Sequence, residues 1–226
     1  IPQFVYGLPE LNGEAIRQAH NIAVPGCFAT CIALGLIPLA RAGILASPVH
    51  TVAATGSSGS GAYAKPGTHH PLRANNIRAY EIFKHRHRPE IEQTVFAAGA
   101  KPGFRLDFVP MSAPLPRGIY ATSIVDVPAE LDAKQVEAML RAAYEGKRFV
   151  KVVVKRTPEV VSIVGTNYAE VGFSLSEPHG ATRSLAMLST LDNLVKGGAG
   201  QAIQNMNLVL GLDEGAGILS DYGMWP

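Results

Sequence analysis

The sequence predicts an α+β domain in which helices cover one face of a mixed or antiparallel sheet. Segments with strand-like alternation dominate the second half of the chain, and few helical segments separate them. A long apolar helix is expected near the start, where apolar residues recur on nearly all sides. No Gly-x-Gly-x-x-Gly motif lies between a strand and a helix, so the residues alone predict no nucleotide-binding fold.

Length and composition set the outer limits. The 226 residues suffice for one large domain or two small ones, and 47% hydrophobic with 17% charged residues is the composition of a globular chain. The formal net charge of +2 is too small to indicate nucleic acid or an anionic membrane as partner. The chain has two cysteines, and no apolar run approaches the roughly 20 residues of a membrane span. We therefore expect a soluble protein of a reducing compartment, the cytoplasm.

The first half of the chain is expected to combine short strands with helices. Its main element is an apolar helix from Cys27 to about Arg41, which Gly43 ends. The Gly/Ser-rich stretch 56–70 predicts a long loop, and a loop of this length inside a compact domain often carries function. The other expected elements are helices at 12–20, 72–84 and 88–99 and strands at 21–26 and 49–55.

The second half is expected to form most of the sheet. An amphipathic helix over 132–146, closed by Gly146, is expected among its strands. The final helix, 193–211, has small residues along one side. Alternation and β-branched residues predict strands at 104–110, 117–127, 148–154, 160–167, 169–177 and 182–192.

Cys27 directly follows Pro-Gly at the expected start of the apolar helix. Free backbone N–H groups and the helix dipole stabilise a thiolate at such a position, so we expect a lowered pKa for this thiol. The alternative is a small buried residue that happens to begin a helix. Cys31 lies one turn later among apolar residues and is expected to be a structural thiol. The spacing of four leaves the two Cα atoms about 6 Å apart, which is marginal for a disulfide.

A basic cluster, residues 84–88 (Lys-His-Arg-His-Arg), offers a partner for this thiol. Two surface histidines beside arginines are common and need no function. Cys27, however, needs a base that is nearly neutral at physiological pH, and His85 or His87 supplies one. The basic neighbours would attract a phosphate or a carboxylate. Glu90 follows within one turn and could hold an imidazole in one tautomer.

His69 and His70 form a second histidine pair, in the long loop. His-x-His and His-His without a well-placed carboxylate are weak ligand patterns, so no metal is expected. The residues thus predict a cysteine nucleophile, a histidine base and a basic substrate pocket. Such thiol acyl chemistry fits a cysteine hydrolase, an acyltransferase or a thioester-forming dehydrogenase, and the residues do not separate these.

Four separated blocks then carry a family resemblance: FVYGLPELNGEAIRQAHNIAVPGCFAT, KHRHRPEIEQ, PRGIYATSIV and GTNYAEVGFSLSE…STLDNLVKGGAGQAIQNMNLVLGL. Over essentially the whole chain they resemble the N-acetyl-gamma-glutamyl-phosphate reductases of arginine biosynthesis. The resemblance implies a fold like the catalytic domains of glyceraldehyde-3-phosphate dehydrogenase and aspartate-semialdehyde dehydrogenase. It also implies a homodimer or homotetramer, in which one face of the sheet meets a second subunit.

In that family an N-terminal dinucleotide-binding domain precedes such a block. We therefore expect this chain to lie downstream of the main strands of the cofactor fold. Residues 1–192 are expected to form the catalytic and dimerisation domain. Residues 193–226, a helix and a tail, are expected to pack with the NADP-binding domain.

The implied activity is NADPH-dependent reduction of N-acetyl-gamma-glutamyl phosphate to a semialdehyde through a cysteine thioester. Cys27 matches the nucleophile of the family's Pro-Gly-Cys motif, and His85 is favoured as the acid or base at the hemiacetal oxygen. The implied substrate-binding residues are His87, Glu90, Arg88, Arg73 and Arg117. The implied cofactor-binding residues are Gly26, Gly56, Ser58, Gly59 and Asn205. Residues 56–61 are expected near the nicotinamide.

Two departures keep alternatives open. Family members often carry a histidine after the proline where this chain has Met111, which leaves the His85/His87 pair as the better base. The stretch PGTHHPLRANN is closer to relatives that act on an aminoadipyl phosphate linked to an acidic carrier protein in lysine biosynthesis. An inactive fragment that only oligomerises or binds a partner is the alternative of another class.

Overall fold

The computed structural model describes residues 3–63, 65, 67 and 69–218. Its centre is a seven-stranded mixed sheet, in which two neighbouring strand pairs are parallel and four are antiparallel. The strand order is β4 (Arg78–Ala79), β5 (Arg105–Ser112), β3 (Pro48–Thr55), β6 (Ile119–Pro128), β9 (Thr182–Leu191), β8 (Ala169–Leu175) and β7 (Val150–Val152). A short parallel ribbon joins β1 (Val5–Tyr6) to β2 (Ile22–Ala23).

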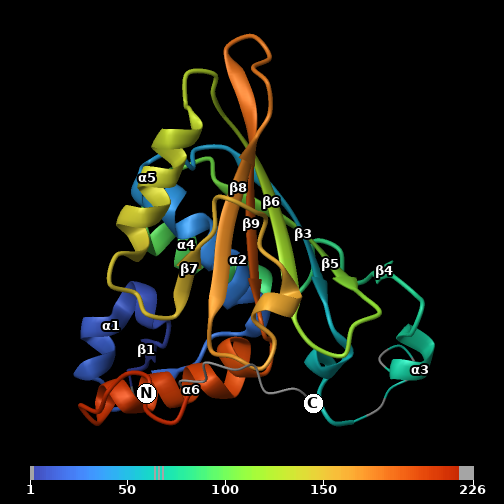
Figure 1. The fold of residues 1–226 in the computed structure, drawn as a ribbon, viewed down its shortest axis with the longest axis vertical. Coiled ribbons are helices and arrows are strands. Elements are labelled where there is room, and N and C mark those ends of the chain that lie inside the picture. The colour runs from blue at the N-terminus through green and yellow to red at the C-terminus, as the bar shows by residue number, and fades with distance from the viewer. Residues whose placement is uncertain (1–2, 64, 66, 68, 219–226) are drawn as a thin grey trace.

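Helices occupy one face and one end of this sheet (Figure 1). Those of the described residues are α1 (Pro9–Arg17), α2 (Cys27–Arg41), α3 (His70–Arg73), α4 (His87–Ala97), α5 (Ala133–Tyr144) and α6 (Gly200–Val209). Two short 3₁₀ helices, η1 (Ser57–Ser60) and η2 (Val160–Ser162), and one π-helix, η3 (Val195–Ala199), complete the helical elements there.

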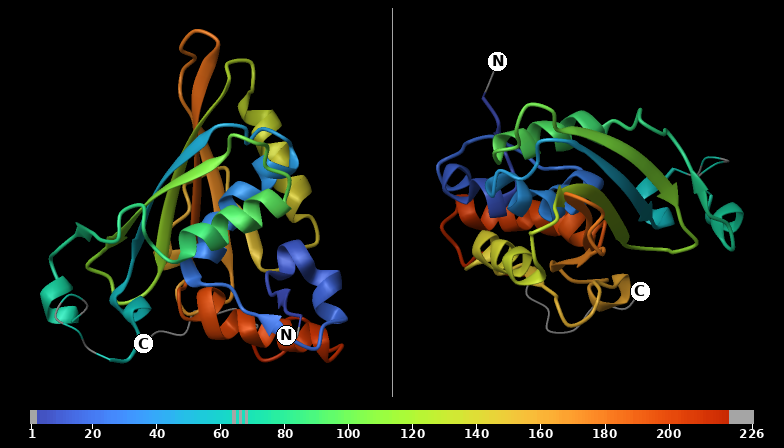
Figure 2. Two further views of the ribbon diagram at one scale, coloured as in Figure 1. Left: turned by 180° about the vertical axis from the view of Figure 1, so that it is seen from behind. Right: turned by 90° about the horizontal axis from the view of Figure 1, so that it is seen from above.

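The apolar helix α2 is the centre of the core. It has the expected bounds, and Gly43 follows it with a φ of +71°. Every residue from Phe28 to Ala40 is buried, because α2 packs on β6, β8 and β9 while α4 and α5 lie beside it (Figure 2). The expectation of a mixed sheet with helices on one face is confirmed.

The opposite face of the sheet is more open. Inward residues of β3 and β6 are buried, whereas the alternate residues point outward. Val52 on β3 and Ile124 on β6 are exposed by 46% and 43%, respectively. These apolar side chains lie on the face that is expected to meet a second subunit.

Three expected elements differ from the structure. The helix expected over 72–84 is absent beyond α3, which ends at Arg73: the chain then turns through β4, and Asn75, Glu81 and Phe83 have positive φ angles that interrupt helical geometry. Residues 160–167 form no strand, because η2 leads into a turn at Gly165, where φ is +80°.

The final helix, expected over 193–211, is divided. The π-helix η3 precedes α6, and Gly198 within η3 has non-helical backbone angles. Both segments lie at the end of the sheet beside α1 rather than within the sheet layer (Figure 1). None of the described helices is long and apolar enough to cross a lipid bilayer.

Candidate active site

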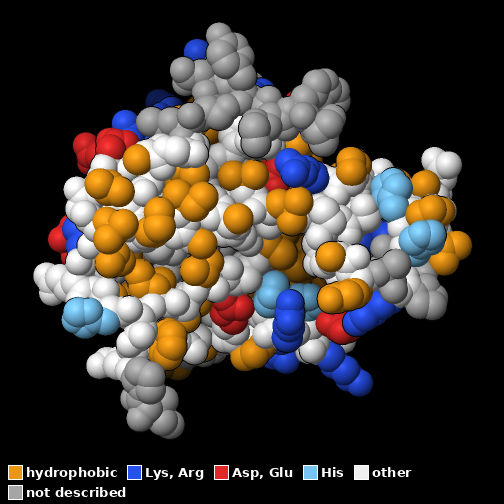
Figure 3. Space-filling model, turned by 90° about the horizontal axis from the view of Figure 1, so that it is seen from below, with side chains coloured by type: hydrophobic (Ala, Val, Ile, Leu, Met, Phe, Trp, Pro, Cys, Tyr) orange, Lys and Arg blue, Asp and Glu red, His pale blue; other side chains and the backbone are white. Residues whose placement is uncertain are grey.

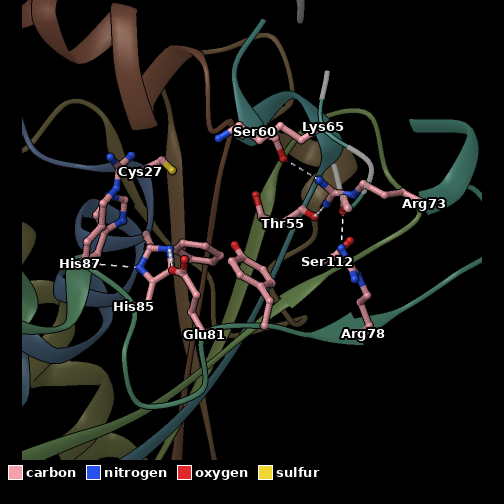
Figure 4. A pocket seen from close by; sticks show the side chains of 15 residues that line it. Cys27, Thr55, Ser60, Lys65, Arg73, Arg78, Glu81, His85, His87 and Ser112 are labelled. Carbon is pink, nitrogen blue, oxygen red and sulfur yellow. Dashed lines mark hydrogen bonds and ion pairs between the residues drawn. The ribbon is translucent and has the colours of Figure 1, made fainter. Parts of the chain in front are cut away.

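A cavity of about 600 Å³ opens beside the N-terminus of α2 (Figure 4). The first turn of α2, the ends of β3 and β5, η1 and the segment 65–87 form its walls. It is lined by Cys27, Phe28, Thr55, Gly59, Ser60, Lys65, Gly67, Arg73, Arg78, Tyr80, Glu81, His85, Arg86, His87 and Ser112. Residues from distant parts of the sequence, the thiol and both histidines among them, therefore meet at one wall.

Cys27 is the first residue of α2. The preceding Gly26 is extended, and its N–H donates a hydrogen bond to Glu90 Oε1 over 2.9 Å. Its carbonyl accepts the N–H of Thr30, which starts the helical ladder. On the other side Gly197 lies so close that a Cβ there would be 2.8 Å from the Cβ of Cys27. These contacts fix the backbone that carries the thiol.

The expected lowering of the Cys27 pKa is not observed. Burial raises the pKa of this thiol above its ordinary value. The N–H groups of Phe28 and Cys27 and the nearby Arg86 guanidinium act in the opposite direction, but they do not outweigh the desolvation. The helix start stabilises the thiolate as expected. The burial of the thiol has the larger effect on its pKa, and the sequence pattern does not reveal that burial.

Cys31 differs as expected. It is buried, and its thiol contacts the carbonyl oxygen and the hydroxyl of Ser189 at 3.5 Å each. Burial raises its pKa to about 12. Both cysteines are free thiols.

The two histidines of the His-x-His motif pack against each other at the cavity wall. Their ring centroids are 4.7 Å apart, and each residue is 8% exposed. The N–H of His87 donates to Nδ1 of His85 over 3.1 Å. Burial lowers the pKa of both imidazoles, that of His87 to about 4, with the neighbouring Arg86 adding to the effect. Both rings are therefore neutral at neutral pH.

His87 is also packed against the loop that leads to Cys27. A Cβ on Gly26 would lie 2.3 Å from His87 Nε2, so only glycine leaves room for the ring. His87 Nδ1 is buried and has no hydrogen-bond partner among the described residues.

Glu90 does not hold an imidazole, contrary to the expectation. Its Oε1 accepts hydrogen bonds from the Gly26 N–H and from the Tyr6 hydroxyl, each at 2.9 Å. Because Glu90 lies on α4 one turn after His87, this carboxylate ties α4 to the loop before Cys27. Glu90 therefore supports the backbone that leads to Cys27.

Of the arginines expected to bind substrate, Arg73 reaches the cavity. It is buried, and its guanidinium donates to Ser60 Oγ at 3.0 Å and to the Thr55 carbonyl at 2.7 Å. Its Nε has no partner among the described residues. Arg88 is not brought to the cavity, because its guanidinium binds the Leu106 carbonyl and Glu92 on the side of β5. Arg117 is paired with Asp192 over 3.6 Å outside the cavity lining.

The expected cofactor residues lie in two places. Gly59 lines the cavity, whereas Gly56 packs tightly on the backbone of Arg117. The Ser58 hydroxyl donates to the Pro116 carbonyl over 2.7 Å. Asn205 is buried on α6, where its Nδ2 donates to the Gly7 carbonyl and its Oδ1 has no partner among the described residues.

Sequence reasoning missed several cavity residues on the segment 65–86. Tyr80 faces His85 with ring centroids 5.9 Å apart, and burial raises its pKa to about 12. Lys65 and Arg78 add basic side chains that were not expected, beside Arg86 of the expected basic cluster. Tyr80 was not identified because residues 72–84 were expected to be helical. The density of basic residues after the Gly/Ser loop was the signal that could have indicated a binding site in this segment. Within the described ranges, no group of His, Cys, Asp and Glu side chains is arranged to hold a metal ion.

Sequence comparison shows that the chain is similar to two kinds of reductase. It is 41% identical to an N-acetyl-gamma-glutamyl-phosphate reductase of Phocaeicola vulgatus over 95% of this chain and 64% of the relative. A reductase of the same name from Methanocaldococcus jannaschii is 36% identical over 99% and 64%. A LysW-L-2-aminoadipate 6-phosphate reductase of Thermomicrobium roseum is 40% identical over 96% and 63%. The chain thus spans 63% to 64% of the length of these relatives.

Structural comparison finds the same fold in aspartate-semialdehyde dehydrogenases. The enzyme II of Vibrio cholerae superposes with a TM-score of 0.70 at 19% identity, over 92% of this chain and 68% of that one. The enzyme of Francisella tularensis gives 0.66 at 14% identity, over 90% and 70%. The predicted fold and the resemblance to the N-acetyl-gamma-glutamyl-phosphate reductases are confirmed.

The family match covers the region in which the site is built. The model described as semialdehyde dehydrogenase, dimerisation domain, matches residues 27–193. This range begins at the thiol, includes both histidines and the seven-stranded sheet, and ends just before the π-helix. The chain therefore belongs to the semialdehyde dehydrogenase dimerisation-domain family.

Proposed function

We propose that the full-length protein reduces N-acetyl-gamma-glutamyl phosphate to N-acetylglutamate 5-semialdehyde, with NADPH as reductant and a thioester on Cys27 as intermediate. The observation that carries this proposal is the position of Cys27, the first residue of a helix, in a cavity with two neutral histidines and several basic side chains. The names of relatives at 36% and 41% identity support the same substrate.

Thioester formation begins with attack of Cys27 Sγ on the acyl carbon. The bond from this carbon to the bridging phosphate oxygen breaks, and the thiol proton leaves with the hydrogen phosphate. The N–H groups of Cys27 and Phe28 and the Arg86 guanidinium assist, because each lowers the pKa of the thiol. They offset part of the desolvation that burial imposes on the thiolate.

The acyl oxygen carries negative charge in the tetrahedral intermediate and needs a donor close to Cys27. His85 is our candidate for this oxygen, and His87 lies beside it at the same wall. The aldehyde is released when the oxyanion form of the thiohemiacetal collapses: the C=O bond re-forms, the C–S bond breaks and Cys27 leaves as the thiolate.

The cofactor, when bound, supplies a hydride to the carbonyl carbon of the thioester. Asn205 Oδ1 is buried without a partner among the described residues, which fits an acceptor for the carboxamide N–H of a nicotinamide. Gly59 lines the cavity and leaves room for a flat ring beside the backbone. Gly26, Gly56 and Ser58 complete the proposed contacts, and NADP rather than NAD is part of the proposal.

Anion recognition is assigned to the arginines. Arg73 supports this role, since its buried guanidinium lines the cavity with an Nε–H that no described residue accepts. Arg117 is paired with Asp192 outside the cavity lining, so its part in the proposal rests on the resemblance alone. Phosphate and carboxylate are the groups to be bound, and both candidate substrates carry them.

A second candidate substrate is an aminoadipyl phosphate linked to an acidic carrier protein, which the relative from Thermomicrobium roseum favours. An acidic carrier would be steered by basic side chains at the cavity rim, so its rate should fall steeply with salt. A small free substrate should show weak salt dependence.

The decisive assay uses the full-length protein in the reverse direction. N-acetylglutamate 5-semialdehyde with phosphate and NADP⁺ is compared with the carrier-linked aminoadipate semialdehyde over a range of salt concentrations. Turnover of the acetylated compound with weak salt dependence supports the proposal. Turnover of the carrier-linked compound alone, with a rate that collapses in salt, assigns the second substrate.

Two further experiments exclude rivals of other classes. NADPH titrated into residues 1–226 should bind weakly or not at all if the cofactor domain is required, whereas the full-length protein should bind it. A cysteine hydrolase would turn over a simple thioester without any nicotinamide cofactor, and we expect no such turnover.

Assembly is the remaining part of the proposal. We assign residues 193–226, of which 219–226 lie outside the described residues, to a contact with the NADP-binding domain. The apolar side chains of α6 and its C-cap are exposed there: Ile203, Met206, Val209 and Leu210. Figure 3 shows a broad hydrophobic area from below, beside histidine and basic side chains. The open face of the sheet is assigned to a second subunit, and the assembly to the cytoplasm.

A further inference from the structure

A buried ion pair joins the N-terminal helix α1 to the π-helix η3. Lys196 on η3 is fully buried, and Glu10 on α1 is 2% exposed. The Lys196 ammonium donates to Glu10 Oε1 over 2.6 Å and to Gln204 Oε1 over 2.7 Å. A lysine is seldom fully buried, and a buried ion pair is often no more stabilising than apolar side chains of similar volume. Its charge-assisted hydrogen bonds are directional, however, and so can fix the relative position of two elements.

The pair lies next to the first turn of α2. Gly197, the neighbour of Lys196, lies so close to α2 that a Cβ on it would be 2.8 Å from the Cβ of Cys27. No side chain fits between η3 and Cys27, so a shift of η3 would move the surface against which Cys27 packs. We propose that Lys196 and Glu10 are positioning residues, whose contact holds η3 against α2 and so fixes the direction of the Cys27 side chain.

The π-helix η3 is an unusual element that depends on its surroundings. It is closed by hydrogen bonds over five residues, such as the one from the Gly197 N–H to the Asp192 carbonyl over 2.8 Å. Such π-turns are rare and are frequent at functional sites. Asp192 holds the start of η3, since its Oδ1 accepts two backbone N–H groups there. Lys196 holds the middle, just before Gly198 departs from helical geometry.

The neighbours of the pair allow one arrangement of its hydrogen bonds. Gln204 Nε2 donates to Glu214 Oε1 over 2.7 Å, and Gln204 Oε1 also accepts Asn167 Nδ2 over 3.1 Å. The amide of Gln204 is therefore held with its oxygen toward Lys196. A displaced η3 would leave a buried charge without its partner, which is unfavourable. Helices α1 and α6, which lie beside each other (Figure 1), are thus joined to η3 by directed bonds.

The consequence for the reaction rests on the proposed function. Cys27 Sγ must approach the acyl carbon at the right distance and angle, and a small misplacement of a nucleophile slows its attack strongly. The substrate itself is held by other residues of the cavity. Loss of the contact between Lys196 and Glu10 should therefore lower kcat and leave KM nearly unchanged.

The test replaces the pair without leaving a buried charge. Glu10→Leu combined with Lys196→Met keeps similar side-chain volumes, so this double variant should fold. If the pair only stabilises the fold, apolar side chains can take its place. If it positions η3, they cannot, because they make no directed contact. The matched control is Glu137→Gln with Arg141→Gln, which removes an exposed ion pair of 2.7 Å on α5.

Iodoacetamide labelling of the full-length protein at pH 8 is the first readout and needs no substrate. In the double variant we expect Cys27 to react at least fivefold faster, because its side chain no longer packs against η3. The rate at Cys31 should stay within twofold of the wild type, as should both rates in the control. Unchanged labelling of Cys27, or an equal acceleration at both thiols, would overturn the proposal.

A milder variant keeps the test decisive if the double variant does not fold. Glu10→Gln retains an oxygen acceptor for Lys196 but removes the ion pair. We expect about twofold faster labelling of Cys27 in Glu10→Gln, with no change at Cys31. A wild-type rate at Cys27, or a rise that Cys31 shares, would overturn the proposal here as well.

Kinetics of the full-length protein provide the second readout. We expect the double variant to lower kcat at least tenfold with KM for the semialdehyde within about threefold, and Glu10→Gln to give a smaller loss of kcat. A folded double variant with kcat within twofold of the wild type would overturn the proposal. If the wild type turns over neither semialdehyde, the proposed function fails, and the labelling rates still decide whether the pair positions Cys27.

Discussion

The first and second turns of α2 each carry a cysteine, and the two thiols lie in opposite surroundings. Cys27 lines the cavity, where its own N–H, that of Phe28 and the Arg86 guanidinium lower its pKa against the effect of burial. Cys31 points to β9, contacts Ser189 and has a pKa of about 12. Four residues along one helix thus separate a thiol at a cavity wall from a thiol sealed in the core.

The difference comes from tertiary contacts that meet at one end of the helix. Gly26, Glu90 and His87 pack around the first turn and leave the thiol at a cavity wall. The second turn meets the continuous surface of the sheet, where the hydrogen-bonding contacts of the Cys31 thiol with described residues are both to Ser189. The position at the helix start supplies the N–H groups that lower the pKa of the thiol. The packing of neighbouring residues determines how far burial offsets this effect.

Replacing each cysteine by serine should give the largest contrast. In the full-length protein we expect Cys27→Ser to lower kcat by about three orders of magnitude or more, because a serine hydroxyl is a far weaker nucleophile. Cys31→Ser, the matched control, should keep kcat within about twofold. Similar losses of kcat in both variants would contradict the contrast and would point to a loss of stability as the common cause. Circular dichroism would check that both variants are folded.

Alkylation measures the contrast without any substrate. Iodoacetamide should modify Cys27 about a hundredfold faster than Cys31 at pH 8, since Cys31 reacts only after local opening. The rate at Cys27 should still rise above pH 9, because burial raises its pKa. Arg86→Gln removes a group that lowers this pKa and should slow the labelling. Peptide mass spectrometry reads both sites, and equal rates would contradict the contrast.

The sequence predicted α2 well because its signals are local. Cys27 to Arg41 reads as a helix from apolar periodicity, and Gly43 marks its end. The strands of the sheet were found for the same reason, as alternation follows from one buried face. The segment 72–84 was misjudged, because three residues with positive φ override a pattern that looks helical.

The site was predictable only in part. Cys27, His85, His87 and Arg73 were identified from motif and resemblance, and the fold brings all four to one cavity. The raised pKa of Cys27 could not be foreseen, because desolvation depends on which side chains pack around the thiol. Tyr80 was not found because an expected helix would have turned it elsewhere.

Acid should weaken the first turn of α2 and spare the second. The pKa of His87 is about 4 in the folded chain, against 6.5 for an unperturbed histidine. Between these values the unfolded chain binds more protons, so the contribution is complete above pH 6.5 and is lost as the pH falls toward 4. We expect a loss of about 2 to 3 kcal/mol from this residue. Urea unfolding at pH 7 and 4.5 measures it.

His87→Gln should show a smaller loss between these two pH values, because the titrating ring is gone. His20→Gln, at an exposed histidine, is the control and should keep the wild-type difference. An unchanged pH dependence in His87→Gln would place the acid sensitivity outside the cavity.

Two glycines of the same region give the finest comparison. A Cβ at Gly26 would lie 2.3 Å from Nε2 and 2.5 Å from Cε1 of His87, although its φ of −68° suits any residue. Gly26→Ala should therefore destabilise the fold by about 1 to 2 kcal/mol through overpacking alone.

At Gly35, within α2, the nearest atom to a Cβ is Ser189 Oγ at 3.4 Å. Gly35→Ala should be neutral or stabilise by up to about 1 kcal/mol, because alanine favours a helix interior. Urea unfolding compares the two variants, and a loss at Gly35 as large as that at Gly26 would mean that the helix is packed as tightly at Gly35 as at its start. Alkylation of Cys27 in Gly26→Ala adds a local readout: a displaced His87 ring opens the cavity wall, so labelling should accelerate there and stay unchanged in Gly35→Ala.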